Sequence, residues 1–244
     1  RHRGPRAGTA GAVGRRAHPV AQDPRPRAAG DRRRPAAQAL EDAAAGWQGA
    51  LLANAWDGHW YLRAFFDDGQ PLGSQANPEA RIDLIAQAWA VLSGVAPVQR
   101  QREALAAVQT QLADNAAGLL RLLHPPLAHA VPSAGYIQAY PPGVRENGGQ
   151  YSHGAVWALM AQAQWANGPE GTTEARDTVY RWFTWLSPAH RTAHATRGAA
   201  YGLEPYVMAG DICSTAPHVG RGGWSWYTGA AAWMHRAAVE AIFG

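Results

Sequence analysis

The sequence predicts an all-α protein built from helical hairpins with long loops at one end. Apolar residues recur at helical spacing in several segments, and Gly, Asn-Gly or Pro residues end those segments. No segment alternates apolar and polar residues as a half-buried strand would. Because 47% of the 244 residues are apolar and 16% are charged, the chain has enough apolar material to bury a core.

Two helices are expected in the first part of the folded region. The segment 36–54 carries Trp47 and other apolar residues at helical spacing. A second helix is expected to open at Pro78, because proline suits the first helical turn. It places Trp89 and its apolar neighbours on one face, and Gly94 is expected to end it.

Three more helices follow at regular intervals. The segment 100–123 has leucines at helical spacing and is stopped by Pro125. The segment 152–166 ends at an Asn-Gly pair, and 173–186 carries an apolar stripe.

The last part of the chain mixes loops with one helix. A short element of uncertain type is expected over 205–212. A Gly-rich loop, 220–223, then leads into a final helix that carries Trp226, Ala230, Trp233, Met234 and Ala237. The stretch 135–149 reads as a loop, although it holds more aromatic and charged residues than a plain linker needs.

The N-terminal segment 1–34 differs in composition from the rest. It is made of Arg, Ala, Gly and Pro with almost nothing to bury, so we expect it to be disordered and the folded domain to span 35–244. Such a run is also what a GC-rich gene gives in a wrong reading frame, and we hold that as a hypothesis. A nucleic-acid-binding arm is disfavoured, because the segment has no aromatic interleaving and no known motif.

Several classes of function are disfavoured by simple counts. The one cysteine, Cys213, cannot form an internal disulfide. No stretch reaches the roughly 18–20 apolar residues of a membrane span. No predicted helix carries a pair of histidines four residues apart, so no metal site is expected. The eleven Trp fit either a sugar-handling protein or a large aromatic core.

Two Gly-rich loops that enter helices are the best candidates for chemistry. The first runs from Arg145 and Glu146 through paired glycines to His153, and helix N-termini offer unpaired N–H donors to anions. Its alternative interpretation is a helix cap with a packed histidine. The second holds Arg221 and Thr228 and suits a phosphate, but it lacks the Gly-Lys-Ser/Thr ending of a Walker loop.

A third polar loop surrounds the segment 56–61. Its aspartates lie beside tryptophans and a tyrosine, a mixture that suits sugar binding. Asp67 and Asp68, which follow, are explained equally well by a solvated turn.

Several long words of this sequence resemble the catalytic module of glycoside hydrolase family 94. This family holds cellobiose and chitobiose phosphorylases and the C-terminal portion of cyclic β-1,2-glucan synthases. The words are WDGHWYLRAFFDDGQPLGS (56–74), RIDLIAQAWAVLSG (81–94), GYIQAYPPGVRENGGQYSHGAVW (135–157), LEPYVMAGDI (203–212) and PHVGRGGWSWYTGAAAWM (217–234). They occur in order over residues 56–244, and the third and fifth are most similar to the synthase branch.

The resemblance implies an (α/α)₆ toroid, of which this chain forms a part, with the active site at one end. It implies inverting phosphorolysis of a β-glucan, in which inorganic phosphate is the nucleophile and no other cofactor is needed. His153, Thr228 and Gly229 match phosphate-binding positions, and Glu146 matches a residue that contacts the sugar on the leaving side. The implied partners are a β-glucan oligosaccharide and phosphate.

Other residues near these positions are placed with less support from the resemblance. Arg145 and Arg221 are expected as neighbours of the site because of their position in the loops. Trp224, Trp226 and Tyr227 fit either stacking on a ligand or packing in the core, and the core is favoured.

The sequence departs from the family at the general acid. In the family, that acid belongs to an Asp-Trp-Asn-Asp motif that precedes the Trp-Asp-Gly motif. In this sequence the corresponding position is taken by the Arg-rich N-terminal stretch, which lacks the motif. We therefore expect a truncated module that is inactive alone, or, alternatively, a non-catalytic carbohydrate-binding remnant. The resemblance further implies a cytoplasmic module whose parent protein is anchored in the inner membrane, with no membrane contact by this segment.

Overall fold

The computed structural model describes residues 33–244. The expected disorder of 1–34, and the reading-frame hypothesis for that segment, therefore fall almost entirely outside the described residues. Its last two residues, Arg33 and Arg34, begin helix α1 (Arg33–Asn54), which thus starts slightly ahead of the predicted position.

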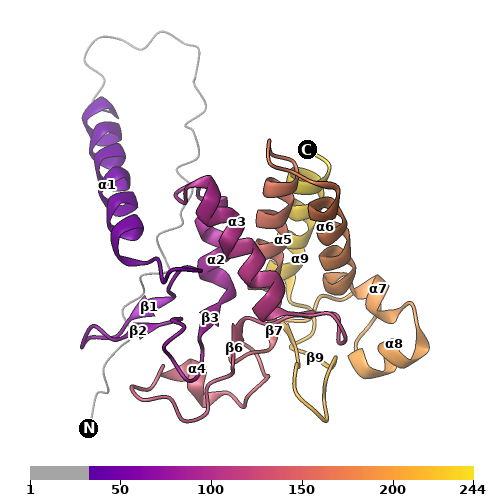
Figure 1. The fold of residues 1–244 in the computed structure, drawn as a ribbon. Helices are drawn as coiled ribbons and strands as arrows, with labels where there is room; N and C mark the ends of the chain where they lie inside the picture. The colour runs from indigo at the N-terminus through magenta and orange to yellow at the C-terminus, as the bar shows by residue number, and fades with distance from the viewer. Residues whose placement is uncertain (1–32) are drawn as a thin grey trace.

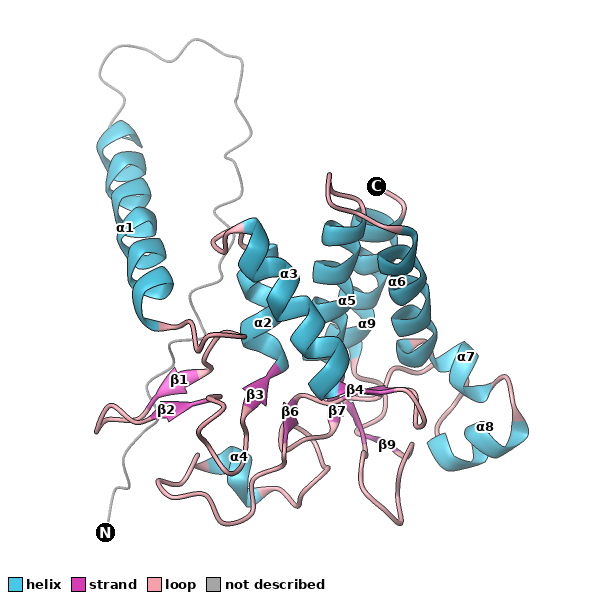
Figure 2. Ribbon diagram, in the orientation of Figure 1, coloured by secondary structure: helices cyan, strands magenta, loops and turns pink. Residues whose placement is uncertain are grey.

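The described chain is a set of helices whose connecting loops gather at one end (Figures 1 and 2). Five helices make up the body: α2 (Leu84–Leu92), α3 (Val98–Ala107), α5 (Ser152–Ala166), α6 (Thr173–Leu186) and α9 (Thr228–Arg236). Within residues 33–244 these helices form an open array rather than a closed ring. The predicted all-α class, with long loops at one end, is confirmed.

The strands within this part of the chain are two residues long and pair antiparallel. They are β1 (Ala64–Phe65), β2 (Pro71–Leu72), β3 (Ile82–Asp83), β4 (Ala113–Asp114), β5 (Leu119–Leu120), β6 (Leu123–His124), β7 (Gln150–Tyr151), β8 (Asp211–Ile212) and β9 (Gly222–Gly223). The remaining elements are α4 (Tyr136–Ala139), α7 (Pro188–Thr192), α8 (Ala195–Tyr201) and the π-helical turns η2 (Val108–Leu112) and η3 (Ala237–Ile242).

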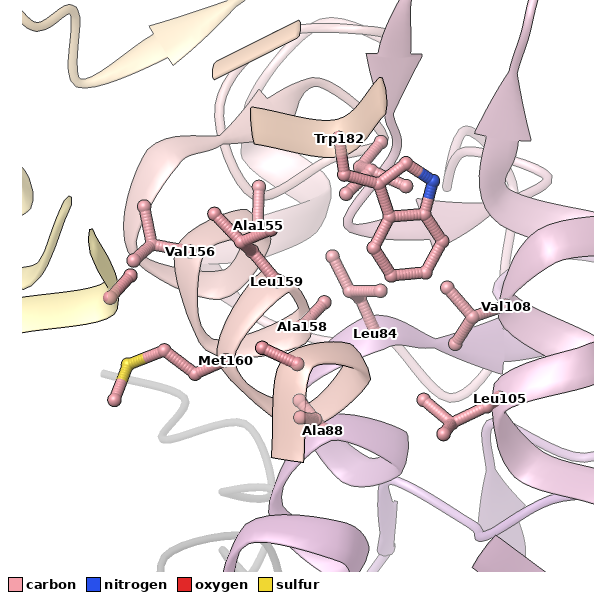
Figure 3. Packing of buried hydrophobic residues seen from close by; sticks show 14 of the residues in the cluster. Leu84, Ala88, Leu105, Val108, Ala155, Val156, Ala158, Leu159, Met160 and Trp182 are labelled. Atoms are coloured by element: carbon pink, nitrogen blue, oxygen red, sulfur yellow. The ribbon is translucent and has the colours of Figure 1, made fainter. Parts of the chain in front are cut away.

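The main core surrounds α5. This helix is apolar on nearly every face and has alanines along much of its length, which let its neighbours approach closely. Leu84 and Ala88 from α2 pack on one side of it, and Trp182 from α6 packs on another (Figure 3). Because α5 begins at the loop end of the molecule, this packing fixes where its first residues, including His153, are presented.

Two predicted helices have the bounds that the sequence indicates, α5 and α6, but the second predicted helix begins later than expected. Pro78 does not open a helix, because Ile82–Asp83 pairs with Leu123–His124 as strands β3 and β6. The carboxylate of Asp83 then caps α2 by accepting the N–H of Ile85 at 2.8 Å. At its other end the helix stops as predicted, with Gly94 in a left-handed conformation (φ +70°).

The third predicted helix, 100–123, is too long. Regular α-helix ends at Ala107, π-helix continues to Leu112, and the chain then turns back as the β4–β5 hairpin. Asp114 Oδ1 accepts the N–H of Ala117 at 3.0 Å and shapes the turn. The turn around Asp114 therefore ends the helix, although the leucines on both sides of it keep a helical spacing.

The C-terminal third also differs in detail. The uncertain element over 205–212 contains only strand β8, and α7 and α8 were not predicted. The last helix begins at Thr228, so Trp226 precedes it instead of lying within it. Pro188 at the first position of α7 is the start signal that sequence analysis passed over.

Helix α1 stands apart from the other helices (Figure 1). Leu40 and Trp47, from its predicted apolar face, are exposed, and only Leu51 near its end packs against a small cluster with Ala55. Among the described helices, none combines the length and the apolar character that crossing a membrane requires.

Candidate functional site

A three-stranded sheet brings the two Gly-rich loops together. Strand β8 lies between β7 and β9, with Tyr151 opposite Asp211 and Asp211 opposite Gly223. The segment that leads into α5 and the segment that leads into α9 therefore lie on either side of one strand. The two loops, which are separate candidates in the sequence, are therefore neighbours in the structure.

His153 and Gly229 are in contact where α5 and α9 begin. A Cβ atom at Gly229 would lie 3.0 Å from His153 Nε2 and 3.3 Å from Cε1, so any side chain there would press on the imidazole. The first N–H groups of each helix have no intrahelical carbonyl to bond, and the helix dipoles add positive potential. The junction of the two helix starts, which we call the α5–α9 junction, is therefore suited to an anion.

The imidazole of His153 is held in an apolar setting. Its ring meets the ring of Tyr227 edge-on, with centroids 5.2 Å apart, and its Nδ1 is buried without a partner among the described contacts. Burial lowers the pKa of His153 from its usual 6.5, which favours the neutral ring near neutral pH. An anion at Nε2 would offset that burial. Thr228, the first residue of α9, is exposed beside it.

A pair of tyrosines closes the inner side of the junction. The hydroxyls of Tyr151 and Tyr227 lie 3.0 Å apart, and the N–H of Tyr227 donates to the carbonyl of Met208. Burial, together with the hydrogen bond to Tyr227, raises the pKa of Tyr151, so this hydroxyl keeps its proton. The hydrogen-bonded pair thus forms a fixed wall on this side of the junction.

Arg145 and Glu146 form an ion pair in the loop ahead of β7. Arg145 Nε lies 3.4 Å from Glu146 Oε2, and each side chain is 14% exposed. The Arg145 guanidinium also stacks on Trp224, 4.6 Å from the ring centroid, and on Tyr140, 5.3 Å from its centroid. Both residues predicted for this loop therefore lie together as a mostly buried pair.

Asp211, which sequence analysis did not single out, holds this loop in place. Its Oδ2 accepts the N–H of Arg145 at 2.8 Å, and Arg145 has a left-handed backbone (φ +51°). Burial raises the pKa of Asp211, and the bond from the Arg145 N–H opposes that shift. A Cβ atom at Gly223 would lie 2.7 Å from Asp211 Oδ1, so the absence of a side chain at Gly223 leaves room for this carboxylate. Its only sequence signal was an acid at the end of the apolar word 203–212.

Asn147 fastens the same loop to the rest of the protein. Its side chain accepts the N–H of Leu127 and donates to the carbonyls of Leu127 and Tyr140, all within 2.7–2.8 Å. A Cβ atom at Gly149 would lie 2.9 Å from both the nitrogen and the oxygen of Arg145. The Asn-Gly-Gly word is thus required by the compact shape of the loop, which presents Arg145 and Glu146.

Other predicted residues are placed differently. Arg221 is exposed in the β8–β9 hairpin, where its N–H donates to His218 and its carbonyl accepts from Cys213. These contacts stay within the hairpin and do not join it to His153. The core was favoured for Trp224 and Trp226, but their side chains are 67% and 61% exposed. Both residues have a left-handed backbone, which directs their side chains away from the core.

The third polar loop is explained by local structure. Asp57 accepts hydrogen bonds from the Ser74 hydroxyl at 3.1 Å and from the Gln75 N–H at 2.6 Å. Asp68 accepts the N–H of Gln70 within the β1–β2 turn. Of the two interpretations of Asp67 and Asp68, the structure favours the turn. Among residues 33–244, no group of three or more His, Cys, Asp or Glu side chains is arranged to hold a metal ion.

Comparison with known proteins agrees with the motifs around this site. The family model described as "Glycosyl hydrolase 94 superfamily, catalytic domain" matches residues 28–244. The chain belongs to this family. The matched range includes both Gly-rich loops and the body of helices that positions them, so the resemblance seen in the sequence is confirmed.

Similar curated proteins include one synthase and several phosphorylases. The chain is 45% identical to the cyclic beta-(1,2)-glucan synthase NdvB of Rhizobium meliloti (strain 1021) over 195 residues, which is 80% of this chain and 7% of that protein. It is 36% identical to solabiose phosphorylase of Paenibacillus borealis over 196 residues, 80% of this chain and 24% of that protein. The N,N'-diacetylchitobiose phosphorylase of Vibrio proteolyticus is 28% identical over 199 residues, 80% and 23% of the two chains. The chain therefore spans a quarter or less of each of these three relatives.

Proposed function

We propose that this chain is part of a longer glycoside hydrolase family 94 enzyme and carries the phosphate-binding and leaving-side sugar-binding half of its active site. The proposed reaction is inverting phosphorolysis of a β-glucan: a phosphate oxygen attacks the anomeric carbon, and the glycosidic bond breaks. The relatives named as phosphorylases support phosphate as a substrate, and the relative named as a cyclic beta-(1,2)-glucan synthase supports a β-glucan.

The observation that carries the proposal is the contact between His153 and Gly229 at the α5–α9 junction. The residues that the family resemblance assigns to phosphate come from opposite ends of the C-terminal half, and they meet at two helix starts. There phosphate would accept hydrogen bonds from the His153 imidazole, the Thr228 hydroxyl and the first N–H groups of α9. Each of these groups favours a dianion and needs no metal.

Glu146 is proposed to bind the sugar on the leaving side. A carboxylate accepts hydrogen bonds from sugar hydroxyls, and the ion pair with Arg145 keeps it charged and oriented. The bond from the Arg145 backbone to Asp211 links this pair to strand β8, which also borders the α5–α9 junction. The sugar and the phosphate are thereby held on one framework.

The proton for the leaving oxygen is proposed to come from a part of the enzyme outside this chain. The Asp-Trp-Asn-Asp word that carries the family's general acid does not occur in the 244 residues. The two carboxylates described at the site are engaged elsewhere, Glu146 with Arg145 and Asp211 with the Arg145 N–H. Since proton donation contributes roughly 10²–10⁴-fold to such reactions, we expect the isolated chain to bind its substrates and not to turn them over.

Changing His153 to alanine is expected to weaken phosphate binding by about tenfold or more, because one charge-assisted hydrogen bond is lost. Thr228→Ala removes a neutral hydroxyl and is expected to weaken phosphate binding about two- to tenfold. Calorimetric titration of the chain with inorganic phosphate measures both effects. His235→Ala is the matched control, because His235 is exposed at the other end of α9. Equal phosphate affinity in His153→Ala and His235→Ala would rule out the assignment.

A second candidate, a carbohydrate-binding protein without catalysis, is favoured by the lack of the acid word. The two candidates differ in one measurable product. Release of glucose 1-phosphate from linear β-1,2-glucan and phosphate, by the chain joined to the acid-bearing segment of a relative, supports the enzyme. Binding of glucan and phosphate without release, in a joined protein that is folded, supports the binding protein.

A further inference from the structure

Three large aromatic side chains are exposed on the segments that precede strand β8 and follow strand β9. Tyr206 is 72% exposed, Trp224 67% and Trp226 61%. The rings of Tyr206 and Trp226 meet with centroids 6.0 Å apart and an angle of 66° between their planes. Single exposed aromatics are ordinary, but here two exposed rings are in contact and a third lies two residues away in the sequence, so together they offer aromatic faces to a ligand. We call these three residues the aromatic platform.

The two exposed tryptophans have a strained backbone conformation. Trp224 and Trp226 have φ values of +53° and +58°, in the left-handed region that bulky side chains avoid. Such a conformation persists only where the surroundings impose it, and it concentrates at functional sites. The carbonyl of Trp224 accepts the N–H of Gly210 at 2.9 Å, and a Cβ atom at Gly210 would lie 3.0 Å from the Cβ of Trp224. Close packing against Gly210 therefore holds the strained loop.

Side chains along this loop point in two directions, toward the core and toward solvent. Tyr227 turns inward, where its hydroxyl meets Tyr151 and its ring meets His153. Trp224 and Trp226 turn outward in the same stretch of chain. A loop that needed only core packing would have buried all three rings, since each burial stabilises the fold. The outward pair is thus available to something outside the described fold.

One member of the aromatic platform, Trp224, adjoins the proposed sugar site. The guanidinium of Arg145 lies 4.6 Å from the Trp224 ring centroid, and Arg145 Nε lies 3.4 Å from the Glu146 carboxylate. A path of contacts therefore leads from Glu146 through Arg145 to Trp224. A ligand that extends outward from Glu146 on this side reaches an aromatic surface next.

We propose that the aromatic platform is an extended subsite that stacks the further glucosyl units on the leaving side of a β-glucan chain. This inference rests on the proposed function and adds chain-length selection to it. A pyranose ring presents C–H faces to an aromatic ring and hydroxyls to its rim, so exposed Trp and Tyr bind it with little loss of side-chain freedom. A disaccharide fills only the positions at the bond to be broken, and a longer glucan reaches the platform.

The test is calorimetric titration of the whole chain with a β-1,2-linked glucose disaccharide and with a longer linear β-1,2-gluco-oligosaccharide. The wild-type chain is expected to bind the longer sugar about three- to tenfold more tightly per stacked ring. Trp226→Ala is expected to remove most of that gain and to leave disaccharide affinity unchanged. Trp226→Phe is expected to restore much of the gain, because it keeps an aromatic face. Trp47→Ala is the matched control, since Trp47 is exposed on α1.

Other outcomes overturn the inference in different ways. If the wild-type chain binds both sugars with equal affinity, the aromatic platform is not an extended subsite, and the proposed function is unaffected. Equal losses for both sugars in Trp226→Ala place Trp226 at the reacting bond instead of on an extended subsite. If the wild-type chain binds neither sugar, the inference and the proposed sugar site fail together. If Trp226→Ala turns a dimer into a monomer by light scattering and changes no sugar affinity, the platform is a contact between copies of this chain.

Discussion

Trp182→Ala is expected to lower the free energy of unfolding by about 3–5 kcal/mol, because it leaves a large cavity in the main core. Trp182 has no exposed surface and packs from α6 into the cluster around α5 (Figure 3). A cavity there removes support from both helices. Urea denaturation followed by far-UV circular dichroism measures the change, and the loss should appear as a lower midpoint at an unchanged slope.

Two further variants separate burial from other effects of the substitution. Trp47→Ala changes the same residue type on exposed α1 and is expected to alter stability by no more than about 0.5 kcal/mol. Trp182→Phe keeps most of the volume and removes an indole N–H that is buried without a partner among the described contacts, so it is expected to cost less than about 1.5 kcal/mol. A midpoint for Trp182→Ala equal to that of Trp47→Ala contradicts the core described for α5 and α6.

Asn147→Ala is expected to have the second-largest effect, a loss of about 2–4 kcal/mol of stability together with weaker glucan binding. The substitution breaks three hydrogen bonds at a fully buried amide and leaves the backbone groups of Leu127 without their partner. Since Asn147 follows Glu146 directly, the loop that presents the carboxylate is expected to loosen. Glucan titration and urea denaturation of the same variant measure the two effects.

The matched control for that variant is Asn77→Ala. Asn77 accepts the N–H of Ser74 and donates to the carbonyl of Pro71, so it also fastens a loop by its amide. It lies by the β1–β2 hairpin, away from the contacts of Glu146, and its loss is expected to reduce stability without changing glucan affinity. If both variants change glucan affinity alike, the effect comes from general loosening and the specific role of Asn147 is wrong.

The parts of the fold that the sequence predicted well are those in which one physical signal dominates. Helices α5 and α6 have long apolar patterns and clear stop signals, and both bounds agree. The third predicted helix failed because leucines at 119–123 keep a helical spacing while serving short strands. The second failed at its start because Ile82–Asp83 pairs with a strand distant in the sequence, which no local pattern reveals.

The site was predictable only in part for a similar reason. The residue types in the Gly-rich loops indicated an anion, and the family resemblance selected His153, Thr228 and Gly229. Nothing local showed that the two loops share strand β8, and so Asp211 was missed. The outward tryptophans were missed because a left-handed backbone at a bulky residue is imposed by neighbouring backbone and leaves no mark in the sequence pattern.

The most direct test of the central claim, that phosphate binds at the α5–α9 junction, is the pKa of His153 with and without inorganic phosphate. Nuclear magnetic resonance of ¹⁵N-labelled histidine side chains gives this value, and His153→Gln identifies the resonance. Without phosphate, burial keeps the pKa of His153 below its usual 6.5. A bound anion stabilises the imidazolium, so saturating phosphate is expected to raise that pKa and to cause proton uptake at pH values between the free and bound pKa. A His153 resonance whose pKa and position do not change with phosphate would contradict the claim.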